Sequence, residues 1–132
     1  MKAYVAAKFE RKAETLEAYE KLRKDGHTIT ADWTKHRAIS PYEQNHETAL
    51  EYTKEDAEGV MDCDVFIALG GSESLSTGVC AELGIAIAMN SMRGKPKIYL
   101  VGNLKEKTMF CHHPAVIVKK SIEEVLEEIR NK

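Results

Sequence analysis

The chain has 132 residues, of which 43% are hydrophobic and 30% charged, a size and composition typical of a single globular domain spanning residues 1–132. Its 19 basic and 21 acidic residues give a net charge of −2, so no excess of positive charge indicates binding to nucleic acid or to an anionic membrane. No apolar run approaches the roughly 20 residues that a membrane span needs.

The cysteines and the N-terminal residues favour a reducing compartment. The chain has three cysteines, an odd number, and their spacing is not that of metal ligands: Cys63, Cys80 and Cys111. The N-terminal residues contain no apolar signal-peptide region. We therefore expect a cytoplasmic protein.

The first half of the chain predicts two strands and two helices. Residues 2–7 (KAYVAA) form a short apolar run typical of a strand, and residues 11–24 place apolar side chains along one helical stripe. The β-branched run at residues 27–32 predicts a second strand. Residues 33–44 are polar and contain a Ser-Pro pair, which indicates a loop, and a helical pattern resumes over residues 45–61.

The middle of the chain carries its most unusual pattern. A buried strand is expected at residues 64–69, a Gly/Ser-rich loop at residues 70–77 and a nearly all-apolar helix at residues 78–89. Glu82 is the one charged residue of that helix. A carboxylate taken out of water costs several kcal/mol unless partners compensate it, so Glu82 is either well satisfied or functional.

The last part of the chain predicts two more strands and a closing helix. The strands are expected at residues 97–101 and 115–118, separated by a long loop, and a capping box opens the helix of residues 121–130. Strands that alternate with helices predict a parallel sheet with helices on both faces. Five such strands fit an α/β doubly wound fold of order 2-1-3-4-5.

In such sheets, ligands bind outside the carboxyl ends of the strands, at the switch point between strands 1 and 3. This rule gathers four segments around one crevice: residues 6–10, 32–36, 70–78 and 102–105, which include Lys8, Trp33 and Asn103. A response-regulator receiver shares this topology but needs acidic residues where this chain has Ala6 and Ala7, so that class is excluded.

Several residues near this crevice have both a functional and a structural interpretation. The loop of residues 70–78 leads into a helix N-terminus and suits a phosphate, or is an ordinary glycine turn with Thr77 as N-cap. Asp56 shares a helix face with apolar residues, where it is either functional or at the rim of the core. Tyr4 would be a core aromatic whose hydroxyl needs a partner. Trp33 is either the wall of a base pocket or a surface anchor.

Cys111, His112 and His113 invite a metal interpretation. Adjacent residues of an extended segment point in opposite directions, and no further ligand cluster stands nearby in the sequence. We therefore expect no metal site.

Residues 76–84 (STGVCAELG) resemble the S-x-G-V-x-x-E-L-G stretch of the nucleoside 2-deoxyribosyltransferase family, and in particular its deoxynucleoside 5′-monophosphate N-glycosidases. The resemblance extends to the N-terminal strand that carries Tyr4, to Asp56, which stands 26 residues before Glu82, and to residues 62–65. It covers roughly residues 1–104.

This resemblance implies a flavodoxin-like fold and cleavage of the N-glycosidic bond of a 2′-deoxynucleoside or its 5′-monophosphate, with no cofactor and no metal. It implies Glu82 as the nucleophile that forms a covalent deoxyribosyl-enzyme, Asp56 as the general acid toward the departing base, and Tyr4 as the residue that orients Glu82. Water or an acceptor base would resolve the intermediate.

The resemblance also implies a substrate and an assembly. Ser76 stands where the monophosphate glycosidases have a serine and the nucleoside transferases commonly have an aspartate, which favours a monophosphate. Ser74, Ser76 and Gly78 would bind it, with Lys8 or Arg11 supplying positive charge. A homodimer or larger homo-oligomer is implied as well.

Two alternatives remain open at this point. A phosphoribohydrolase with a P-G-G-x-G-T-x-x-E loop is suggested by Gly70, Gly71 and Glu82, although Thr77 precedes Glu82 by five residues instead of three. A nucleotide-sensing module that keeps the pocket without turnover is the non-enzymatic alternative. The fold by itself cannot separate them.

Overall fold

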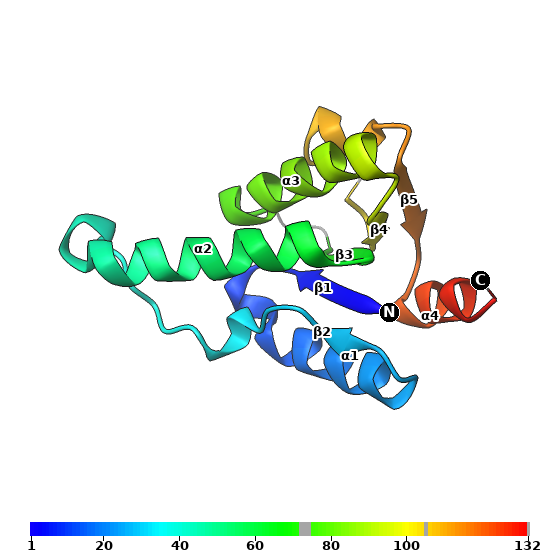
Figure 1. The fold of residues 1–132 in the computed structure, drawn as a ribbon, viewed down its shortest axis with the longest axis horizontal. Helices are drawn as coiled ribbons and strands as arrows, with labels where there is room; N and C mark the ends of the chain where they lie inside the picture. The colour runs from blue at the N-terminus through cyan, green and yellow to red at the C-terminus, as the bar shows by residue number, and fades with distance from the viewer. Residues whose placement is uncertain (72–74, 105, 132) are drawn as a thin grey trace.

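The computed structural model describes residues 1–71, 75–104 and 106–131. Five strands form one parallel sheet in the order β2-β1-β3-β4-β5, which confirms the expected topology (Figure 1). The strands are β1 (Lys2–Ala6), β2 (Thr28–Ile29), β3 (Val65–Leu69), β4 (Lys97–Val101) and β5 (Val116–Lys119). The helices are α1 (Lys12–Lys24), α2 (His46–Asp62), α3 (Thr77–Arg93) and α4 (Ile122–Arg130).

The helices cover both faces of the sheet. α2 and α3 pack against each other on one face. α1 and α4 share the other face, where Lys21 of α1 pairs with Glu123 of α4 at 3.0 Å and Arg130 pairs with Asp25 at 2.6 Å. The N-terminal end of α2 projects beyond the sheet (Figure 1).

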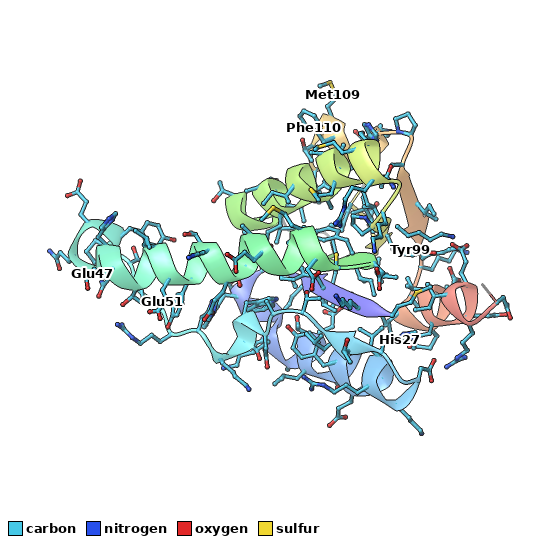
Figure 2. The ribbon with its side chains drawn as sticks, viewed as in Figure 1. His27, Glu47, Glu51, Tyr99, Met109 and Phe110 are labelled. Carbon is cyan, nitrogen blue, oxygen red and sulfur yellow. The ribbon has the colours of Figure 1, made fainter. Side chains whose placement is uncertain are left out.

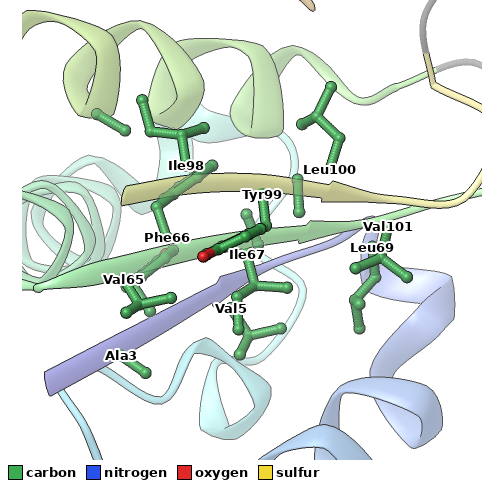
Figure 3. Close-up of a cluster of buried hydrophobic side chains, with 14 of the residues drawn as sticks. Ala3, Val5, Val65, Phe66, Ile67, Leu69, Ile98, Tyr99, Leu100 and Val101 are labelled. Atoms are coloured by element: carbon green, nitrogen blue, oxygen red, sulfur yellow. The ribbon is translucent and has the colours of Figure 1, made fainter. Parts of the chain in front are cut away.

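The core lies on both sides of the three central strands (Figure 3). All five residues of β3 are buried, because helices cover this strand on both faces, and such a strand is apolar throughout. Tyr4, Phe66, Ile67 and Tyr99 have no exposed surface. The sheet is therefore a rigid platform for the loops at its carboxyl edge.

Two expected elements differ from the structure. The second strand pairs only over Thr28–Ile29, because the chain then turns away: the hydroxyl of Thr30 donates to the carbonyl of Gly59 at 2.7 Å, and a 3-10 turn begins at Trp33. α3 extends to Arg93, four residues beyond the expected end, and stops at Gly94, whose φ of 78° lies in the left-handed region.

Close approaches at two glycines position the elements around the crevice. A Cβ on Gly59 would lie 2.6 Å from the Cβ of Ala31 and 3.2 Å from the Tyr4 ring, so glycine lets α2 pack closely on β1 and on the segment that follows β2. A Cβ on Gly102, whose φ is 107°, would lie 2.0 Å from the carbonyl oxygen of Gly70. The segments that follow β3 and β4 therefore cross in contact with each other.

Candidate active site

Tyr4 and Glu82 meet at the face of the sheet that α3 covers. The Tyr4 hydroxyl donates a hydrogen bond to Oε2 of Glu82. Tyr4 is fully buried, and its ring stacks on Phe66 of the neighbouring strand with a centroid separation of 6.0 Å and an interplanar angle of 3°. The phenol is therefore held in one orientation, aimed at the carboxylate.

Burial controls the protonation of this pair. Burial and the charge of Glu82 raise the pKa of Tyr4, so its hydroxyl stays a donor. Burial raises the pKa of Glu82 to about 7, opposed by the hydrogen bond from Tyr4 and reinforced by the charge of Asp56. Perturbed carboxylates in a cleft are characteristic of functional sites.

Asp56 lies on α2, beside the same pair. Its Oδ1 is buried and has no hydrogen-bond partner among the described residues. Burial raises the pKa of Asp56 to about 6, opposed by the charge of His36 and reinforced by that of Glu55. The charge of Asp56 therefore opposes the ionisation of Glu82.

A cavity of about 450 Å³ opens beside these carboxylates. It is lined by five of the residues singled out in the sequence and by a loop that follows β2: Glu82, Asp56, Ser76, Gly78 and Trp33, with residues 36–40 and Tyr42. Phe9 and Val79 complete an aromatic and aliphatic wall. Such a volume and mixed lining suit a small organic molecule.

The start of α3 supplies polar groups to the cavity. Ser76 is the N-cap, and its hydroxyl accepts from the amide of Val79 at 3.1 Å, so the expected cap at Thr77 is wrong by one residue. The amides of Thr77 and Gly78 precede the first helical hydrogen bond, which runs from Cys80 to Ser76. These amides and the helix dipole favour the binding of an anion at the start of α3.

Trp33 closes the inner wall of the cavity. Its Nε1 donates to the carbonyl of Val5 at 2.7 Å, and its ring tilts by 45° toward Phe9 at a centroid distance of 6.3 Å. The indole is buried, which favours the pocket-wall interpretation over a surface anchor.

Some expected residues are not part of this lining. Lys8 is half-buried and Asn103 is exposed, and neither lines the cavity. Arg11, the N-cap of α1, pairs with Glu14 in the first turn of that helix. Ser74 lies outside the described residues. Of the four expected segments, 6–10, 32–36 and 70–78 reach the cavity, whereas 102–105 does not in its described part.

Arg37 was not singled out by its sequence pattern. It is the one Lys or Arg among the residues that line the cavity, and its guanidinium has no partner among the described residues. Its backbone amide donates to the Tyr52 hydroxyl at 3.2 Å. The available signal was a cation in the segment that follows β2, at the ligand-binding edge of the sheet.

In the part of the chain that the structure describes, no group of three or more His, Cys, Asp or Glu side chains could hold a metal ion. In the same residues, no helix is both long and apolar enough to cross a bilayer. Cys63, Cys80 and Cys111 are free thiols.

Comparison with known proteins gives matches at the level of structure. No protein-family model and no curated protein sequence matches the chain. The structure of the Clostridium botulinum CMP N-glycosidase BcmB is similar with a TM-score of 0.64 and 22% identity, covering 100% of both chains. A 2-deoxyribosyltransferase from Bacillus psychrosaccharolyticus is similar with a TM-score of 0.67 and 18% identity, covering 95% of this chain and 90% of that one. The chain therefore has the flavodoxin-like α/β fold of these two enzymes.

Proposed function

We propose that this protein is an enzyme of the nucleoside 2-deoxyribosyltransferase type that cleaves the N-glycosidic bond of a 2′-deoxynucleoside, with the 5′-monophosphate favoured. The observation that carries the proposal is the Tyr4–Glu82 hydrogen bond beside the unpartnered carboxyl of Asp56, in one cavity. The shared fold with an N-glycosidase and a 2-deoxyribosyltransferase supports it.

In this mechanism Glu82 is the nucleophile. Its ionised carboxylate attacks the anomeric carbon of the sugar through an oxocarbenium-like transition state, and the C–N bond to the base breaks. Asp56 gives its proton to the departing base. The Tyr4 hydroxyl keeps one oxygen of Glu82 engaged, so the other oxygen is the one that attacks.

The second step restores both carboxyls. Water attacks the anomeric carbon, the ester bond to Glu82 breaks, and the water proton passes to the Asp56 carboxylate. An acceptor base can replace water and form a new nucleoside. Whether water or a base attacks decides between a hydrolase and a transferase.

Recognition of a 5′-phosphate is proposed at the start of α3. Ser76, Gly78 and the free amides of the first turn provide donors, and no carboxylate stands at position 76 to repel the phosphate. Arg37 supplies the positive charge that Lys8 and Arg11 were expected to supply. A guanidinium pairs with phosphate in a bidentate manner.

Self-association is part of the proposal. Met92 at the end of α3 and Met109 and Phe110 in the following 3-10 turn (Met109–His112) are 77%, 78% and 55% exposed. Figure 2 shows Met109 and Phe110 together at the outer edge of the molecule. Large exposed apolar side chains favour contact with a second copy, which light scattering after gel filtration would detect as a dimer or larger species.

The deciding experiment is incubation with deoxynucleosides, their 5′-monophosphates and CMP, with and without a free acceptor base. Base release from the monophosphate that is lost in Glu82→Ala supports the hydrolase, and exchange only with an acceptor supports the transferase. Glu51→Ala is the matched control, because Glu51 lies on the projecting part of α2, away from the cavity (Figure 2). Tight binding of nucleotides without turnover would overturn the enzyme proposal in favour of a sensor, and release of base from ribose 5′-monophosphates alone would favour a phosphoribohydrolase.

A further inference from the structure

His36 is held in place by three residues of α2. Its Nε2 lies 3.0 Å from Oε2 of Glu55, and its Nδ1 lies 3.8 Å from Oδ2 of Asp56. Its ring stacks on Tyr52 with a centroid separation of 3.7 Å and an interplanar angle of 3°. Residues at i, i+3 and i+4 share one helix face. The imidazole therefore packs on one continuous surface of α2, formed by Tyr52, Glu55 and Asp56.

This imidazole separates two hollows of the surface. It lines the cavity that contains Glu82, and together with Glu55 and Tyr52 it also lines an open groove between α2 and residues 30–36. The side chain of His36 is only 14% exposed, whereas that of Glu55 is 58% exposed. His36 therefore stands between Asp56 and a solvent-facing carboxylate.

The two oxygens of Asp56 have different surroundings. Oδ2 faces His36, whereas Oδ1 is buried without a hydrogen-bond partner among the described residues. A buried polar atom without a partner in the protein calls for an explanation, and a ligand or a reaction is one such explanation. Oδ1 is thus the oxygen left available to a substrate.

We infer that His36 is a positioning residue for Asp56: it holds Oδ2 and leaves Oδ1 to exchange a proton with the departing base. The role of Asp56 in this inference rests on the proposed function. The link between His36 and Asp56 is independent of it and can be measured in the resting protein.

The electrostatic reason lies in the groups around Asp56. A protonated imidazole stabilises the carboxylate form, while burial and Glu55 stabilise the protonated form. Glu82 of α3 and the hydroxyls of Tyr4 and Tyr19 also face this carboxyl, and none of them is a cation. Without His36, Asp56 would bind its proton more tightly and would be a weaker general acid.

The test is the titration of Asp56 in the variant His36→Phe. Phenylalanine keeps a ring that can stack on Tyr52 but removes both nitrogens. Carbon-13 NMR of the labelled Asp56 carboxyl should show a titration midpoint roughly one pH unit higher than in the wild type. The control His46→Phe changes an exposed histidine outside the cavity and should leave the midpoint unchanged.

Kinetics give a second measurement. The pH dependence of kcat/KM for a cleaved substrate should shift to higher pH with the NMR midpoint in His36→Phe, while KM changes little. An unchanged Asp56 midpoint in a folded His36→Phe protein would overturn the inference. If no substrate is cleaved by the wild type, the proposed function fails, and the NMR titration still decides whether His36 controls Asp56.

Discussion

The phenol of Tyr4 and the carboxylate of Glu82 are hydrogen bonded although 78 residues separate them in the chain. A second pair of the same kind, Tyr99 and Glu128, links β4 to α4 on the opposite side of the sheet. The first pair faces a cavity and a second carboxyl, whereas the second is joined by Lys119 at 2.8 Å from Glu128. The protein thus contains a candidate catalytic Tyr–Glu pair and a structural one that serves as its internal control.

Removal of the Tyr4 hydroxyl should lower activity through Glu82. In Tyr4→Phe the carboxylate loses the hydrogen bond that lowers its pKa, so the pKa of Glu82 rises above about 7 and less of it is ionised at neutral pH. We expect kcat to fall about 100-fold and the acidic limb of the pH–rate profile to move to higher pH.

The matched control is Tyr99→Phe, which removes the phenol of the second Tyr–Glu pair. It should lower thermal stability without a change in the pH–rate profile. Equal pH–rate profiles for Tyr4→Phe and the wild type would contradict the orienting role of Tyr4.

Replacement of the nucleophile should stop the reaction without damage to the fold. Glu82→Gln keeps the volume and a partner for Tyr4 but cannot attack the sugar, and we expect at least a roughly 1,000-fold loss of base release. In the wild type, mass spectrometry of the quenched reaction should find the deoxyribosyl adduct on the peptide that contains Glu82. An adduct on any other residue would contradict this assignment.

The two raised carboxyl pKa values predict a stability that falls as pH increases. Asp56 and Glu82 have folded-state pKa values of about 6 and about 7, above their ordinary values, so the folded state binds more protons than the unfolded state between about pH 4 and pH 7. Their contribution is fully present below that range and is lost across it, by at most about 3 kcal/mol for each group. The difference in unfolding free energy between the wild type and the Asp56→Asn, Glu82→Gln double variant, measured by urea denaturation at several pH values, should change with pH in this window. A flat difference would show that neither carboxyl is perturbed.

Arg37 and Lys8 are alternative candidates for binding the 5′-phosphate. If Arg37 pairs with the 5′-phosphate, Arg37→Ala should raise KM for a deoxynucleoside 5′-monophosphate by about 10- to 100-fold, corresponding to a charge-assisted hydrogen bond, and should leave KM for the deoxynucleoside unchanged. Arg37→Lys should restore part of the loss. Lys8→Ala should have little effect, and the reverse result would return the phosphate role to Lys8. An equal rise in KM for the nucleotide and the nucleoside in Arg37→Ala would mean that Arg37 binds the base.

The pattern of apolar runs predicted the sheet order, whereas Tyr4, Asp56 and Glu82 were grouped through the family resemblance. Apolar strand runs determine the topology, and a lone carboxylate in an apolar helix is visible in the sequence itself. The loop that follows β2 was harder to predict, since its course depends on tertiary contacts. The side-chain amide of Asn45 donates to the carbonyl of Ile39 at 2.9 Å, and the backbone amide of Arg37 donates to the Tyr52 hydroxyl. For the same reason Arg37 was not predicted as a residue of the cavity. Asn103 was expected at this cavity but does not line it.

Two glycines of α3 provide a test of where the substrate sits. A Cβ on Gly78 would meet only the Ser76 hydroxyl, at 3.9 Å, so alanine fits there, but the new methyl group would stand in the lining of the cavity. Gly84 also has open space around it and lies outside the lining. Because alanine is favoured over glycine in a helix, Gly84→Ala should stabilise the protein by up to about 1 kcal/mol with KM unchanged. Gly78→Ala should raise KM for the monophosphate without loss of thermal stability, and an unchanged KM would place the phosphate away from the start of α3.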